Sequence, residues 1–70
     1  MSERHLIVTQ RESSWEYIYR GTITGPFKGR DDAIEAAIKE AREIDDADLE
    51  VIVQDVDLNQ ETVWRASDGR

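Results

Sequence analysis

The chain has 70 residues, no cysteine and a formal net charge of −7 at pH 7. Seventy residues suffice for one domain, since an independent core usually needs about 50 or more. The lack of cysteine excludes disulfides and thiolate zinc sites. Residues 1–20 alternate polar and apolar side chains instead of forming a secretory signal, and no stretch approaches the roughly 18 apolar residues of a membrane span. We therefore expect one soluble, cytoplasmic domain over residues 1–70, with an ordered core at about 4–66 and a flexible tail at 67–70.

The charge is divided unevenly along the chain. Residues 1–30 carry five basic and three acidic side chains, a balance of +2, whereas residues 31–70 carry four basic and thirteen acidic side chains, a balance of −9. Nucleic acid is held mainly by clustered Lys and Arg side chains that neutralise phosphates. The acidic part would repel a duplex. Its charge is typical of a solvated face, or of a surface for a basic protein partner.

Two runs near the start predict an antiparallel hairpin. Residues 5–11 are rich in β-branched side chains, residues 12–14 form the turn, and residues 15–20 alternate with a period of two. This alternation places the aromatic side chains on one face: Trp15, Tyr17 and Tyr19. The segment 22–24 at most extends the second strand, because Gly25-Pro26 is expected to end the ladder: proline lacks an amide hydrogen.

Residues 31–44 predict an amphipathic helix. Gly29 is a suitable N-cap, and Asp31 and Asp32 lie at the positive end of the helix dipole. Apolar side chains at helical spacing form one stripe: Ile34, Ala37, Ile38, Ala41 and Ile44. The alanines in this stripe would let the helix lie close to a sheet.

A second hairpin is predicted after the helix, from strands at about 49–56 and 61–66 joined by a turn at 57–60. We therefore expect an α+β fold of two layers, in the order β-β-α-β-β. Two hairpins form an antiparallel sheet, and the helix packs on one face of it. The strand side chains expected to meet the helix are Leu6, Val8, Trp15, Tyr17, Tyr19, Leu49, Val51 and Val53. The strand order and the face of Trp64 are left open.

The candidates for catalysis and metal binding have simpler explanations. His5 is the only histidine, and no nucleophile or carboxylate adjoins it along the chain. Asp55-x-Asp57-x-Asn59 resembles the start of a calcium loop. However, an EF-hand requires glycine at its sixth position and glutamate at its twelfth, where this chain has Gln60 and Ala66. We predict no catalytic residue, no cofactor and no metal, and hence no enzyme.

The most informative surface is the sheet face turned away from the helix. Apolar patches on such faces often mark association sites. The candidate interaction surface consists of Ile7, Ile18, Arg20, Ile52 and Trp64. The leading hypothesis is a small, acidic, non-enzymatic module that binds a protein of unknown identity, with a homodimer as one form of this. The alternative is a nucleic-acid-associated protein that binds through the first hairpin, in the basic part of the chain.

Several of these residues, in this order, resemble a family of short bacterial proteins, the domain of unknown function 2188. The shared features are His5-x-Ile7-Val8, Trp15 at the second strand, Phe27 before the segment 32–37, and a valine-rich strand. The resemblance covers residues 5–64 and implies the β-β-α-β-β order, without any activity or catalytic residue. The chain departs from the family at residues 57–60, where the family often has an Asp-Gly turn, and it is more acidic than we would expect of such a protein.

Overall fold

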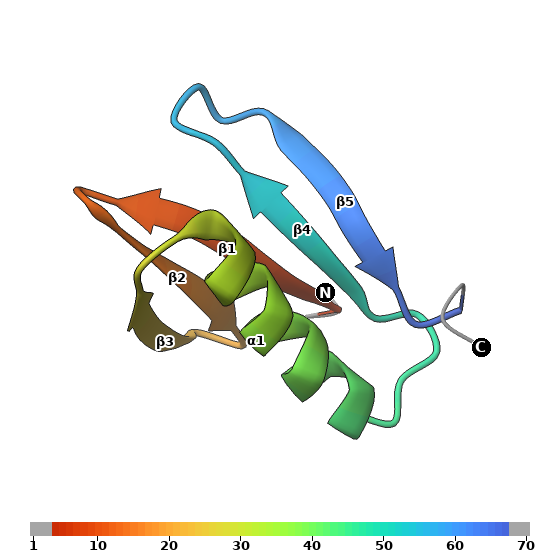
Figure 1. The fold of residues 1–70 in the computed structure, drawn as a ribbon. Coiled ribbons are helices and arrows are strands. Elements are labelled where there is room, and N and C mark those ends of the chain that lie inside the picture. Colours follow the sequence, from red (N-terminus) through yellow and green to blue (C-terminus); the bar gives the residue numbers. More distant parts are fainter. Residues whose placement is uncertain (1–3, 68–70) are drawn as a thin grey trace.

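A computed structural model describes residues 4–67 as one sheet of five strands with a single helix on one face (Figure 1). The elements are β1 (His5–Arg11), β2 (Ser14–Tyr19), β3 (Thr22–Phe27), α1 (Arg30–Glu43), β4 (Glu50–Gln54) and β5 (Gln60–Arg65). The strand order across the sheet is β3-β2-β1-β4-β5. Of the tail predicted at 67–70, residues 68–70 lie outside the described part. Within residues 4–67, no helix has the length and apolar character needed to cross a membrane.

The predicted antiparallel sheet of two hairpins is wrong in strand number and in strand direction. The sheet is mixed, because β1 and β4 lie side by side in parallel, with Leu6 opposite Val51. The missing strand explains both errors. Successive elements reverse the direction of the chain, so one extra strand before α1 makes β4 parallel to β1 instead of antiparallel. The link between these parallel neighbours then includes a helix, as such crossovers usually do.

The extra strand is β3, in the segment treated above as a connector. Its residues Thr22 and Ile23 pair with the end of β2. Gly25-Pro26, a cis peptide, does not stop the strand, because β3 lies at the edge of the sheet. An edge strand tolerates proline, since its outward amide makes no ladder hydrogen bond.

The helix confirms the predicted N-cap at Gly29 and begins at Arg30. Its buried side chains are Ala33, Ala37 and Ala41, whereas Ile34, Ile38 and Ile44 are half-buried beside them. The line of closest contact therefore consists of alanines, and the isoleucines flank it. Small side chains allow α1 to approach β1, β2 and β4 closely.

The core confirms the face that the alternation assigned to the helix. The predicted strand residues form one cluster with the alanines of α1: Leu6, Val8, Tyr17, Leu49, Val51 and Val53 are buried, and Trp15 and Tyr19 pack against them. The ring of Tyr17 stacks on Phe27 with 6.0 Å between centroids. The aromatic side chains of β2 therefore belong to the layer between sheet and helix.

Candidate interaction surfaces

Four isoleucines lie side by side on the sheet face opposite α1, which we call the open face. Ile18 pairs with Ile23 of β3 and with Ile7 of β1, and Ile7 pairs with Ile52 of β4. Paired residues point to the same side of a sheet, so these four side chains form an isoleucine row across four strands. Ile23 is 51% exposed and Ile52 is 8% exposed, with Ile7 and Ile18 half-buried between them. The accessible surface of the isoleucine row therefore lies mainly at its β3 end.

Charged side chains border the isoleucine row and balance one another. On one side, the Glu50 carboxylate lies 3.0 Å from Nε of Arg65 and 3.5 Å from Nε2 of His5. On the other side, Arg11 Nη2 lies 3.4 Å from an Oε2 atom of Glu16, whose side chain is largely buried. Two arginines thus oppose two glutamates on the strands of this face. The excess negative charge of the chain lies elsewhere, mainly on the helix and the loops.

The structure brings together three of the five predicted surface residues. Ile7, Ile18 and Ile52 are neighbours in the isoleucine row. Arg20 lies in the turn after β2, with its guanidinium carbon 5.7 Å from the ring centroid of Tyr19. Ile23 was missed, because β3 had been treated as a connector. The alternation of Thr22-Ile23-Thr24 would have revealed it.

Trp64 does not join the isoleucine row. It pairs with the buried Val51 and packs against the core on the helix side. The cause is a β-bulge in β5: Thr62 pairs with Ile52, yet Trp64 pairs with Val51 instead of Glu50. One extra residue in a strand moves the following side chains to the opposite face.

The aromatic side chains of β2 are relevant to the alternative hypothesis of nucleic-acid binding through the first hairpin. Tyr17 is buried and Trp15 and Tyr19 are half-buried against the core, so the three rings together do not form one exposed surface for stacking successive bases. Arg11 is paired with Glu16 on the same hairpin. The charge balance of +2 in residues 1–30 is then the only basis of this alternative.

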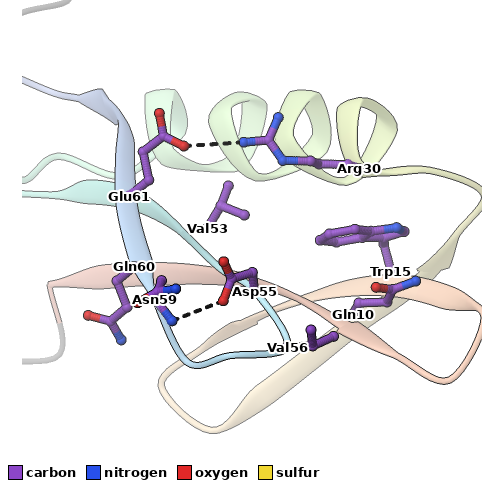
Figure 2. A pocket seen from close by; sticks show the side chains of 9 residues that line it. All are labelled: Gln10, Trp15, Arg30, Val53, Asp55, Val56, Asn59, Gln60 and Glu61. Carbon is purple, nitrogen blue, oxygen red and sulfur yellow. Dashed lines mark hydrogen bonds and ion pairs between the residues drawn. The ribbon is translucent and has the colours of Figure 1, made fainter.

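A separate pocket of about 410 Å³ lies where the sheet extends past the first turn of α1 (Figure 2). Its lining comes from five elements and the β4–β5 loop: Gln10, Trp15, Arg30, Val53, Asp55, Val56, Asn59, Gln60 and Glu61. Arg30 at the start of α1 bridges to Glu61 of β5, with 3.5 Å between Nη2 and Oε1. Sequence reasoning did not find this pocket, because its members are far apart along the chain.

Asp55, considered above for calcium binding, has a structural role in the β4–β5 loop. Its Oδ1 accepts hydrogen bonds from the backbone amides of Asp57 at 2.9 Å and Asn59 at 3.0 Å. Such Asp-to-backbone bonds are typical of turns. Over residues 4–67, no group of three or more His, Cys, Asp or Glu side chains is arranged to hold a metal ion.

Tyr17 is the one described side chain with a clear electrostatic perturbation. Burial, and then the hydrogen bond that its hydroxyl donates to Glu40, raise the pKa of Tyr17 above its usual value of 10.0. The charge of Glu43 acts in the same direction, and a hydrogen bond with Thr24 acts against it. The phenol therefore stays protonated in the folded protein at pH values where the unfolded chain ionises it.

We expect this shift to make the protein less stable at alkaline pH. A pKa that is higher in the folded state contributes stability below the unfolded value of about 10, and this contribution is lost as the pH rises further. Chemical denaturation between pH 8 and 11.5 should show a steeper loss of unfolding free energy for the wild type than for Tyr17→Phe. Glu40→Gln should weaken the effect without removing it, since burial is the larger cause. Equal slopes for the wild type and Tyr17→Phe would contradict this assignment.

No protein-family model, no curated protein and no solved structure matches this chain. Its class is therefore defined by its own fold: an α+β domain with a five-stranded mixed sheet and a single helix. The resemblance to the domain of unknown function 2188 stays a prediction.

Proposed function

We propose that this protein is a non-enzymatic interaction module of the cytoplasm that associates with a second copy of itself through the isoleucine row. The observation that carries the proposal is the placement of four isoleucines on adjacent strands of the face that α1 does not cover. Removing apolar surface from water is favourable by roughly 25 cal/mol per Å². A second sheet laid on this face would cover Ile7, Ile18 and Ile23.

The charge distribution favours a second copy as the partner. Arg11 and Arg65 balance Glu16 and Glu50 on the open face, so two such faces meet without net repulsion. Two-fold symmetry also lets a basic group on one copy lie near an acidic group on the other. The two acidic helix layers would then lie on opposite outer surfaces. Both sheets would lie between these two helix layers, so the distance between the layers exceeds the electrostatic screening length of about 8 Å at physiological salt.

The size of the face predicts a weak dimer. Five strands at about 4.8 Å spacing and about five residues of roughly 3.3 Å each give a face of roughly 24 by 17 Å. Two copies would bury on the order of 800 Å², below the roughly 1,000 Å² expected of a stable interface. We therefore expect a reversible, concentration-dependent dimer.

Ile23→Glu should prevent this association. Ile23 is 51% exposed on an edge strand, so a carboxylate there leaves the core intact but places a charge in the proposed contact. Size-exclusion chromatography with light scattering should show the wild-type mass rising toward that of a dimer at high micromolar concentration, while Ile23→Glu stays monomeric. Leu58→Glu is the matched control, because Leu58 is also an exposed aliphatic residue, 73% exposed in the β4–β5 loop and outside the isoleucine row. This variant should dimerise like the wild type.

Salt provides a second readout of the same contact. Added salt screens the repulsion between two copies of charge −7 and does little to an apolar contact, so dimerisation should strengthen from low to high salt. Weakening by salt would show that charged groups make the contact. A wild type that remains monomeric at high micromolar concentration at both low and high salt would refute the proposal.

A further inference from the structure

The pocket beside the first turn of α1 lies on the helix side of the sheet, opposite the isoleucine row. Figure 2 shows the indole of Trp15 projecting into the hollow, toward Val53 and Asp55. Val56, at the rim, is 77% exposed. The pocket thus combines one aromatic wall, two aliphatic side chains and three charged ones, Arg30, Asp55 and Glu61, in a volume of about 410 Å³.

Two of the three charges in the pocket cancel. Arg30 and Glu61 form an ion pair of 3.5 Å. The third charged side chain, Asp55, has no basic partner: its Oδ1 accepts two backbone amides, and no ion pair joins it to a basic side chain of residues 4–67. The pocket therefore carries one uncompensated negative charge, in a chain whose net charge of −7 also attracts cations from a distance.

We propose that this pocket binds an arginine side chain of a partner protein. A guanidinium stacks on indole, the aromatic system that attracts cations most strongly. It also donates charge-assisted hydrogen bonds to a carboxylate, here to Oδ2 of Asp55, because Oδ1 already accepts two backbone amides. Its aliphatic stem would lie along Val53 and Val56. Gln10 and Asn59 also line the hollow, and a carboxamide oxygen from either can accept the remaining donors.

An anionic ligand fits the pocket less well. The amides of the first turn of α1 have no side-chain cap, which by itself would favour an anion. However, Asp31 and Asp32 occupy that turn, and Asp55 and Glu61 line the pocket beside it. Four carboxylates against the single Arg30 would repel phosphate or carboxylate.

The test is a ¹⁵N NMR titration with the peptide acetyl-Gly-Arg-Gly-amide, carried out on the monomeric variant Ile23→Glu so that dimerisation does not interfere. Saturable shifts should appear at the indole NH of Trp15 and at the amides of Gln10 and Asp55. The same peptide with citrulline keeps the shape of arginine without its charge, and it should bind about tenfold or more weakly, as expected for the loss of charge-assisted hydrogen bonds.

Asp55→Asn should weaken binding of the arginine peptide by a similar factor of about ten. The asparagine retains an oxygen for the amides of Asp57 and Asn59, so the loop is preserved. Asp57→Asn is the matched control: it removes one charge from the same loop at a residue that does not line the pocket, and it should bind like its parent.

Three results would overturn the arginine site: no saturable shift at the pocket, equal affinity for the citrulline peptide, or equal losses in Asp55→Asn and Asp57→Asn. A titration with inorganic phosphate that shifts the same resonances and competes with the peptide would also overturn it, in favour of an anion site. If Asp55→Asn does not fold, the citrulline comparison alone decides. The light-scattering test of the isoleucine row is independent of all these outcomes.

Discussion

Leu6→Ala should lower the free energy of unfolding by about 3 kcal/mol, the usual range for a buried leucine being about 2–5 kcal/mol. Leu6 is fully buried in β1, opposite Val51 of β4, in the layer that packs against α1. The truncation removes apolar contacts and leaves a cavity that a small core of short strands cannot easily close. A domain of this size has a total stability of roughly 4–10 kcal/mol. The variant should therefore lose a large share of it, measured by urea denaturation at pH 7.

The chain contains a matched control for this experiment. Leu58→Ala removes the same atoms from a side chain that is 73% exposed in the β4–β5 loop. Exposed positions of this kind usually change stability by less than about 0.5 kcal/mol. A comparable loss at both positions would mean that Leu6 does not lie in the core between sheet and helix.

The faces of the strands were predictable because alternation is a local property. In β1, β2 and β4, a period of two assigned Leu6, Val8 and Tyr17 to the core and Ile7 and Ile18 to the opposite face. The direction of β4 was not predictable in this way. It depends on how many elements precede it, so a single mistaken connector was enough to reverse it.

Two local features of the structure, the edge position of β3 and the bulge in β5, account for the remaining errors of the sequence-based prediction. The rule that proline ends a ladder holds inside a sheet, but β3 lies at the edge, and no local pattern distinguishes an edge strand from a central one. In β5, simple alternation continued from Thr62 would place Trp64 opposite Glu50 on the open face. The bulge moves it beside Val51 instead. The side of Trp64 therefore depends on one extra residue that the sequence does not mark.

The pocket could not be predicted from the sequence for a different reason. Trp15, Arg30 and Asp55 belong to β2, α1 and the loop after β4, and they meet only because β1 and β4 are parallel neighbours whose ends lie beside the start of α1. With an antiparallel β4, the opposite end of that strand would lie beside Trp15. A site that depends on strand direction could not be derived from a prediction in which that direction was wrong.

Gly25→Ala should destabilise the protein by about 2–3 kcal/mol, because it adds a steric overlap to a backbone conformation that L-residues avoid. Gly25 has φ +154°, and a Cβ there would lie 3.0 Å from the carbonyl oxygen of Trp15 and 3.1 Å from Cβ of Glu16. Both neighbours belong to β2 at the bulge where β3 joins it. The substitution should therefore push the edge strand away from the sheet.

Gly21→Ala separates the two contributions to this loss. Gly21 also has a positive φ, +80°, but nothing lies within 4 Å of the Cβ it would gain, so we expect only the conformational cost of about 1 kcal/mol. Urea denaturation of both variants gives the difference between their losses of unfolding free energy. We attribute this difference to the contact of Gly25 with β2. Equal losses would show that Gly25 does not pack against Trp15 and Glu16. Gly25→Ala could also lose more unfolding free energy than Gly21→Ala and dimerise more weakly than the wild type. This result would show that the packing of β3 on β2 positions Ile23 in the isoleucine row, because Ile23 lies on the same edge strand.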